Sequence, residues 1–184
     1  MAGRGSIHRT SSRSRSATGN GSLAGAIAVV AGATRGAGRG IARALGEAGA
    51  TVYCTGRSVP GKRSPYDRPE TIDETADMIT AAGESAFAVQ VDHTVEREVE
   101  ELFHRVVRER GRLDVLVNSI AGEDPSMAQW CSFWKTDLKN AELALRQSLL
   151  VPHHHSQACC SPHDSQSSWA YCRSHGKQRA ARRR

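Results

Sequence analysis

Three glycines follow an apolar run near residue 30, and their spacing suits the binding of phosphate groups. The segment Val30–Ala42 reads VAGATRGAGRGIA, with Gly32, Gly36 and Gly38 between the run and a helical pattern. In such a turn one glycine permits the tight reversal, another lets backbone N–H groups approach a pyrophosphate, and a third lets the helix pack closely on the strand. The helix N-terminus adds partial positive charge. Glycines of an ordinary loop are the alternative, but this placement favours a dinucleotide site.

The pattern extends beyond this turn. G-x-x-x-G-x-G resembles the T-G-x-x-x-G-x-G fingerprint of the short-chain dehydrogenase/reductase family, with Ala31 in place of the Thr. Asp92, after the third predicted strand, is similar to the family's aspartate that bonds the adenine ring. Asn118 begins residues 118–122 (NSIAG), which resemble the family's N-N-A-G motif in a loosened form. The resemblance covers about Leu23–Leu150 and implies a Rossmann-like fold that binds NAD or NADP.

The residues after the second predicted strand bear on which dinucleotide is bound. NAD-selective sites place a carboxylate there for the ribose 2′-hydroxyl, whereas residues 55–58 read TGRS and contain no acid. Arg57 can instead bind a 2′-phosphate through charge-assisted hydrogen bonds. Arg35 matches a second basic residue that the family's NADP users commonly carry, and Lys62 and Arg63 add positive potential. The sequence therefore predicts NADP rather than NAD, with Arg57 as an ordinary solvated loop arginine as the alternative.

The predicted cofactor site draws on the loops that follow four strands. Its residues are Gly32, Thr34, Arg35, Gly36, Gly38, Arg57, Ser58, Asp92, His93 and Asn118. We predict no metal site, because the histidines and cysteines of residues 151–184 fit no closed tetrahedral ligand spacing.

The acid–base pair that the resemblance implies is missing. Members of the family lower the pKa of a tyrosine, about 10 when free, with a lysine four residues further along a helix. Of the three tyrosines, Tyr53 lies in a predicted strand and Tyr66 in a loop. Tyr171 precedes Lys177 by six residues, which is the wrong spacing for one helix face. We predict no catalytic residue, and we expect the chain to be inactive as written.

Strands and helices alternate strictly along residues 23–150. The predicted strands are 26–31, 51–55, 86–91 and 113–117, and the predicted helices are 38–49, 69–82, 95–110 and 133–150. Thr94 is the predicted cap of the third helix. This alternation predicts an α/β, Rossmann-like doubly wound parallel sheet. We expect the sheet to be truncated after its fourth strand and the following helix, which leaves that strand as an uncovered apolar edge.

Charge divides the chain into three parts. The 184 residues carry a formal net charge of +6, with +4 in residues 1–22, −3 in residues 23–150 and +5 in residues 151–184. The Ser/Arg-rich residues 1–22 are expected to be a disordered leader, with an extension from a misassigned start or an organelle transit peptide as alternatives. Five cysteines, an odd number without a signal-peptide pattern, indicate a reducing compartment. The expected location is cytoplasmic, or mitochondrial if residues 1–22 direct import.

Residues 151–184 depart from the preceding pattern. They are rich in His, Cys and Arg, and we expect a disordered basic tail. When the codons are read one base later, the residues from His153 can become IITAKHAAPLMI and those from Trp169 can become GLIVEVTE, a helix and a strand that suit the fold. We therefore predict a change of reading frame near Val151, with a genuine divergent tail as the alternative. The transcript sequence across codons 149–155 decides between them.

Three functions fit these observations. The first is an NADP-dependent short-chain dehydrogenase/reductase, transferring hydride between nicotinamide and a carbonyl or alcohol carbon, that is inactive in this form. The second is a non-catalytic NADP-binding module, and the third is a basic adaptor that binds nucleic acid through the two ends of the chain. No apolar run reaches the roughly 18–20 residues of a membrane span. For intact relatives we expect a small carbonyl or alcohol substrate and assembly of identical chains.

Overall fold

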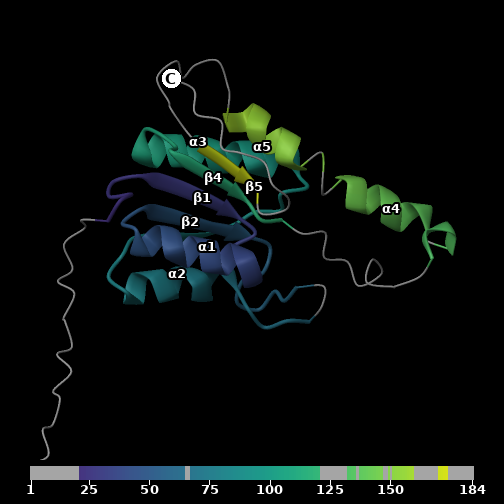
Figure 1. Cartoon of the computed structure of the whole chain (residues 1–184), viewed down its shortest axis with the longest axis horizontal. Coiled ribbons are helices and arrows are strands. Elements are labelled where there is room, and N and C mark those ends of the chain that lie inside the picture. Colours follow the sequence, from purple (N-terminus) through teal and green to yellow (C-terminus); the bar gives the residue numbers. More distant parts are fainter. Residues whose placement is uncertain are drawn as a thin grey trace, which may run out of the picture.

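In the computed structural model, the described residues form a sheet of five parallel strands in the order β3-β2-β1-β4-β5 (Figure 1). The strands are β1 (Ile27–Ala31), β2 (Thr51–Gly56), β3 (Ala86–Gln90), β4 (Val115–Asn118) and β5 (Ala170–Arg173). The structure describes residues 21–64, 67–120, 132–135, 137–146, 149, 151–159 and 170–173. The direction of strand addition reverses between β1 and β4, where doubly wound sheets bind their ligands. The predicted α/β Rossmann-like class is confirmed.

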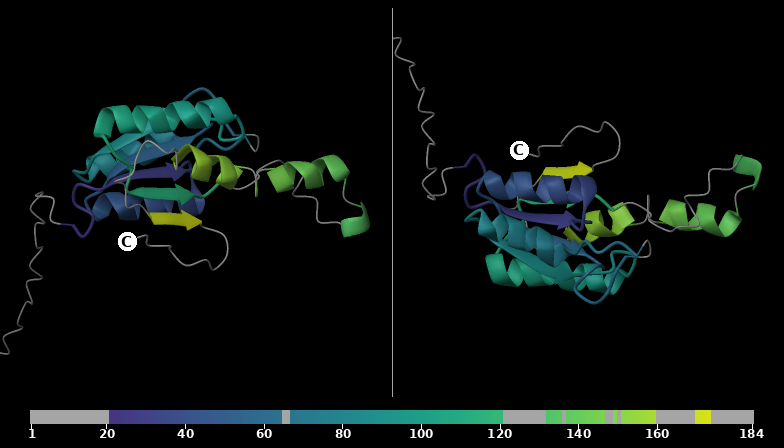
Figure 2. Two further views of the ribbon diagram at one scale, coloured as in Figure 1. Left: turned by 90° about the horizontal axis from the view of Figure 1, so that it is seen from above. Right: turned by 90° about the horizontal axis from the view of Figure 1, so that it is seen from below.

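Helices cover both faces of this sheet. They are α1 (Gly36–Glu47), α2 (Ile72–Ala81), α3 (Glu96–Arg110), α4 (Leu138–Leu145) and α5 (Val151–Cys159), with a 3₁₀ turn, η2, at Phe133–Lys135. α1 and α2 lie on one face and α3 and α5 on the other, whereas α4 extends away from the sheet (Figure 1 and Figure 2). No helix in the described part of the chain has the length and apolar character needed to cross a membrane.

The sheet separates two hydrophobic clusters. One cluster packs Ala28 and Val30 of β1 against α1 and α2. The other packs Ile27 and Val29 of β1 against α3. Because successive residues of a strand point to opposite faces, a central strand covered on both sides must be apolar at every position. All five residues of β1 are buried accordingly.

Side-chain hydrogen bonds lie at the starts of α2 and α3, and the starts predicted from periodicity differ from the observed ones. α2 begins at Ile72 rather than at residue 69, because Thr71 and Glu74 form a capping box in which Glu74 N donates to Thr71 Oγ1 over 3.1 Å. Thr94, the predicted cap of α3, does not cap it. Its N and Oγ1 instead donate to Asp92 Oδ1, over 3.0 and 2.7 Å.

The helix predicted over residues 133–150 is divided into η2 and α4. Asp137 separates the two elements, since its Oδ1 accepts a hydrogen bond from Lys139 N over 3.0 Å. A side-chain acceptor at this position starts a new helix.

The sheet continues beyond its fourth strand, contrary to the predicted truncation. β5 pairs in parallel with β4, from Val115 opposite Ala170 to Asn118 opposite Arg173. The edge of β4 that was expected to be uncovered is therefore paired along its whole length.

α5 likewise lies in the segment that was expected to be disordered. Val151, His155 and Ala158 are four and three residues apart, so they share one face of a helix. Val151 and His155 are buried, and Ala158 packs against the cluster on α3. The expected lack of structure thus does not hold for residues 151–159 and 170–173. The rest of this tail, and the leader apart from residues 21 and 22, lie outside the described residues. The change of reading frame stays a prediction.

Candidate functional site

The glycine-rich turn joins β1 to α1 at the carboxyl edge of the sheet. Gly32 has a φ of +85°, and a Cβ there would lie 2.6 Å from the Ser119 carbonyl oxygen. The N–H groups of Gly32 and Ala33 donate to the Thr55 carbonyl oxygen over 2.9 and 3.0 Å. The turn is thus held between the ends of β2 and β4, in a space and conformation that only glycine fits.

Gly38 lets α1 start close against this turn. A Cβ on Gly38 would collide with the Gly32 carbonyl oxygen. Gly36, the first residue of the helix, has a φ of +55°. Arg35 precedes it in an extended conformation, and its side chain does not cap the first turn. The leading N–H groups of α1 are therefore suited to bind an anion.

Arg39 ties the turn to α2, and the sequence interpretation did not find it. Its Nε donates to the Thr34 carbonyl oxygen over 2.9 Å and to Thr75 Oγ1 over 3.0 Å. Its Nη2 pairs with Glu74 Oε2 over 3.0 Å. Thr75 Oγ1 also donates to the Ala33 carbonyl oxygen over 2.9 Å. An arginine in a helical pattern is usually solvated, so the sequence carried no clear signal for this contact.

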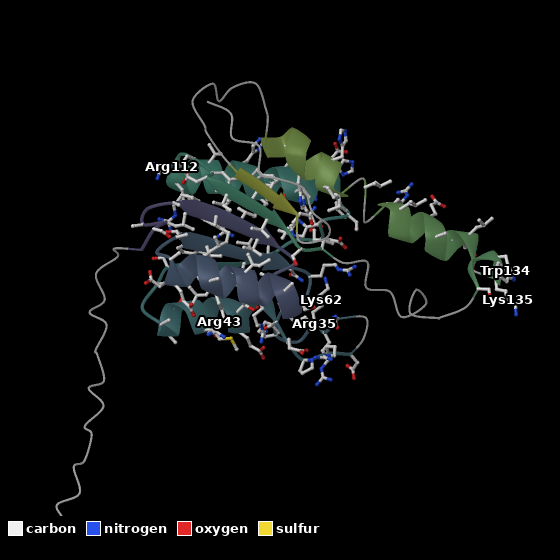
Figure 3. The ribbon with its side chains drawn as sticks, viewed as in Figure 1. Arg35, Arg43, Lys62, Arg112, Trp134 and Lys135 are labelled. Atoms are coloured by element: carbon white, nitrogen blue, oxygen red, sulfur yellow. The ribbon has the colours of Figure 1, made fainter. Side chains whose placement is uncertain are left out.

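Basic side chains gather at the same edge of the sheet. Arg57 follows β2 directly. Arg35 and Lys62 lie at the carboxyl end of the strands, whereas Arg43 and Arg112 lie away from it (Figure 3). Arg35 comes from the loop between β1 and α1, whereas Arg57 and Lys62 come from the loop between β2 and α2.

The chain around Arg57 is fixed by backbone hydrogen bonds. Ser58 is buried, and its carbonyl oxygen accepts the first N–H of α2 over 3.1 Å. Val59 and Lys62 exchange two backbone hydrogen bonds of 3.2 and 2.9 Å, and Gly61 between them has a φ of +82°. Proline and glycine at the two central positions of this turn suit a type II geometry.

The loop between β2 and α2 keeps a positive balance. Residues 57–70 contain four basic and two acidic side chains. The acids are paired within the loop, Asp67 with Arg63 over 3.0 Å and Glu70 with Arg68. The Arg68 hydrogen bond lowers the pKa of Glu70 to about 2, and the charge of Arg35 contributes to that shift. Each acid is thus paired with an arginine of the same loop, which leaves net positive charge beside the turn.

Two further polar side chains stand at the ends of β3 and β4. The carboxylate of Asp92 accepts both hydrogen bonds from Thr94, which fixes it after β3. Asn118 is 4% exposed, and its Oδ1 accepts from Ile120 N over 3.1 Å. Both predicted residues therefore reach the edge that holds the glycine turn. Residues 121 and 122 of the motif lie outside the described residues.

Comparison with known proteins decides the family. The family model described as "short chain dehydrogenase" matches residues 26–141, which is more than half of the chain. The chain belongs to the short-chain dehydrogenase family. Among curated relatives, Dehydrogenase/reductase SDR family member 1 of Mus musculus is 45% identical over 74 residues, which are 40% of this chain and 20% of that protein.

Solved structures of short-chain dehydrogenases resemble the chain in fold. A putative member from Burkholderia xenovorans is 27% identical with a TM-score of 0.65, over 76% of this chain and 51% of that one. A metagenomic short-chain oxidoreductase in complex with NADP is 27% identical with a TM-score of 0.61, over 75% of this chain and 56% of that one. The chain spans about half the length of these structures.

Two of the predicted site residues, Thr34 and His93, form hydrogen bonds with other groups of this short-chain dehydrogenase. The backbone carbonyl oxygen of Thr34 accepts the hydrogen bond from Arg39 described above. His93 is 4% exposed, and its ring nitrogens lie 2.9 Å from Thr55 Oγ1 and 2.9 Å from His155 Nε2. Both ring nitrogens are therefore engaged inside the protein. Burial, the His155 ring and the charge of Arg57 hold the pKa of His93 well below its usual range.

Two buried side chains of β2 are unsuited to acid–base or nucleophilic chemistry. Burial raises the pKa of Cys54 to about 12, so the thiol stays protonated. Burial raises the pKa of Tyr53 as well, and its hydroxyl donates to Glu109 Oε2 over 2.7 Å on the side of α3. Within the described ranges, no group of three or more His, Cys, Asp or Glu could hold a metal ion.

Proposed function

We propose that the chain binds NADP at the β1–α1 turn. The observation that carries this proposal is the cradle formed by Gly32 and Gly38, where any added side chain would meet backbone. These two glycines keep the turn tight against the sheet. At Gly36, the first residue of α1, an added Cβ would meet no atom within 4 Å, so phosphate oxygens can approach the leading N–H groups of the helix there. Asp92 and Asn118 are the fixed polar groups for the rest of the dinucleotide. NADP, when bound, supplies the nicotinamide that accepts or gives a hydride.

The preference for NADP over NAD is assigned to Arg57 and Arg35. β2 ends in Gly56 and is followed by Arg57, so no carboxylate stands where a ribose 2′-hydroxyl would be bound. An acid there would repel a 2′-phosphate, whereas a guanidinium can bind it bidentately. The positive balance of residues 57–70 and the NADP complex of the metagenomic relative support this choice.

We further infer that the 184-residue chain binds the cofactor without turning it over. Its family transfers hydride between nicotinamide and a carbonyl or alcohol carbon, and that chemistry uses a tyrosine with a lysine four residues later. The residues four positions after Tyr53, Tyr66 and Tyr171 are Arg57, Glu70 and His175. None of the three is the lysine that this chemistry uses.

Calorimetric titration with NADP and NAD tests the site. Arg57→Gln is expected to weaken NADP binding by about 10- to 100-fold, because a charge-assisted hydrogen bond contributes about 1.5–3 kcal/mol. NAD binding should not change, since NAD lacks the 2′-phosphate. Arg43→Gln is the matched control on α1, away from the edge of the sheet, and should leave both affinities as they are.

Equal affinities for NADP and NAD would contradict the cofactor preference, and binding of neither would overturn the proposed function. A separate assay follows the absorbance of NADPH with a panel of aldehydes and ketones. No consumption is expected, and steady turnover by the purified chain would overturn the inferred inactivity.

A further inference from the structure

Three hydrogen bonds in series connect α5 to β1, the strand that leads into the glycine turn. His155 Nε2 lies 2.9 Å from His93 Nδ1, and His93 Nε2 lies 2.9 Å from Thr55 Oγ1. Thr55 Oγ1 donates to the Val30 carbonyl oxygen over 3.1 Å. All three side chains are buried, with His155 and Thr55 at 0% exposure.

The positions of the protons in this series follow from its last member. The Val30 carbonyl oxygen can only accept a hydrogen bond, so the Thr55 hydroxyl donates its single hydrogen to it. Thr55 Oγ1 must then accept from His93, which places a proton on His93 Nε2 and leaves His93 Nδ1 bare. His155 Nε2 consequently carries a proton and donates to His93. Both rings are neutral, and His155 Nδ1 is a buried acceptor with no donor among the described residues.

The backbone of Thr55 also forms hydrogen bonds with the glycine turn. The Thr55 carbonyl oxygen accepts the N–H groups of Gly32 and Ala33, over 2.9 and 3.0 Å. The side chain of Thr55 is fixed by His93, and His93 is fixed by His155. Docking of α5 and the shape of the turn therefore depend on one continuous polar contact.

We propose that His155 is a positioning residue for the dinucleotide site, acting through His93 and Thr55, and that protonation of the histidine pair releases α5 and weakens cofactor binding. The proposal rests on the proposed function, since it assigns a pH-dependent regulator to that same site.

Among the described residues, the apolar ring and the cations packed against the pair disfavour a positive charge on it. The face of α3 packed here is apolar, with the Phe103 ring edge-on to His155 at 6.0 Å between centroids. The nearby titratable groups are His154 on α5 and Arg57 after β2, both of which oppose a second cation. The carboxylate of Asp92, beside His93 in sequence, is bonded to Thr94. A proton on His93 Nδ1 would also face the N–H of His155.

The direction of the pH effect follows from these contacts. Burial lowers the pKa of His155 to about 4, and that of His93 lies well below its usual range. A released histidine titrates at about 6.5, so the docked state is favoured fully above that pH and progressively less below it. Lowering the pH from about 7.5 to about 5.5 should raise the ratio of released to docked α5 by about tenfold for each histidine involved.

Hydrogen exchange and NADP affinity, measured on the full chain at both pH values, test the proposal. Protection factors of the α5 amides and of Gly32 and Ala33 are expected to fall together at the lower pH, and NADP affinity should fall with them. The 2′-phosphate itself takes up a proton near pH 6, by analogy with other phosphate monoesters. For this reason the test compares how steeply protection and NADP affinity change with pH in the unmodified chain and in its variants.

His155→Gln keeps a side-chain N–H donor for His93 but cannot be protonated. We expect it to retain α5 protection at pH 7.5 and to reduce the pH slope of protection by about tenfold across the range. His155→Leu removes the donor and should lose protection of α5 and of the turn at both pH values. His153→Gln, on the exposed side of α5, is the matched control and should behave as the unmodified chain.

Two results distinguish failure of the role given to His155 from failure of the proposed function. If NADP binds at pH 7.5 but α5 protection has the same pH slope in His155→Gln as in the unmodified chain, the role of His155 is overturned and the proposed function stands. If NADP does not bind at pH 7.5, the proposed function and the cofactor part of this inference both fail. Exchange at Gly32 and Ala33 in His155→Leu then still decides whether α5 and the turn are coupled.

Discussion

The methyl group that distinguishes alanine from glycine has no room at position 38, since it would collide with the backbone carbonyl of Gly32. Gly40, two residues further along α1, has no atom within 4 Å of an added Cβ and needs no positive φ. The two positions therefore give a matched pair for testing what the turn requires.

Gly38→Ala is expected to destabilise the chain by about 1–3 kcal/mol, the usual cost of overpacking, and to abolish measurable NADP binding. Gly40→Ala should raise the free energy of unfolding by about 0.5–1 kcal/mol, because alanine is the better helix residue. Urea unfolding and calorimetric titration measure the two effects. Unchanged NADP affinity in Gly38→Ala would show that the turn is not the phosphate cradle.

Residue type and spacing were enough to predict the glycine turn and the basic residues that follow β2. Gly32 and Gly38 could be found because a strand, a tight turn and a helix follow one another in sequence. Arg39 and His155 could not be found in this way, because their partners on α2 and beside β3 are distant in sequence. A polar residue buried by such partners looks the same in sequence as a solvated one.

At the scale of elements, the capping residues at the start of α2 also bind Arg39, the side chain that ties the glycine turn to α2. Thr71 Oγ1 accepts from Glu74 N, and the Thr71 carbonyl oxygen accepts from Arg39 over 3.2 Å. Glu74 also pairs with Arg39. Loss of the cap should therefore loosen the contact between α1 and α2.

Thr71→Ala is expected to cost about 1 kcal/mol of stability, within the range of about 0.5–2 kcal/mol for helix caps. Thr80→Ala on the same helix is the control. Thr80 is exposed and only bonds back to the Ala76 carbonyl, so its replacement should leave stability unchanged or slightly raised. Equal losses in urea unfolding of the two variants would contradict the role of the capping box.

Periodicity predicted the existence and order of the first four strands and three helices, and it failed where the periodic signal was mixed. In α5 the buried face is Val151, His155 and Ala158, and a histidine in that face hid the apolar stripe. Over residues 133–150 the apolar spacing predicted one helix, whereas the side chain of Asp137 starts a second one. Hydrogen bonds of single side chains thus set boundaries that spacing cannot.

At the scale of the whole molecule, charge and fold point to different binding surfaces. The net charge of +6 belongs to the two ends of the sequence, while residues 23–150 carry −3 and hold the candidate site. An adaptor for nucleic acid would use the ends, and a dinucleotide-binding domain would use the local cations of the β2–α2 loop. The location of a bound ligand therefore separates the two.

Mapping amide chemical shifts by NMR, as NADP is added to the isotope-labelled 184-residue chain, tests the central claim most directly. The account predicts the largest shifts at Gly32–Gly38 and at Arg57, with little change at Arg43 on the far part of α1. Shifts confined to residues 1–22 and 174–184, or no saturable shifts at the turn, would contradict it.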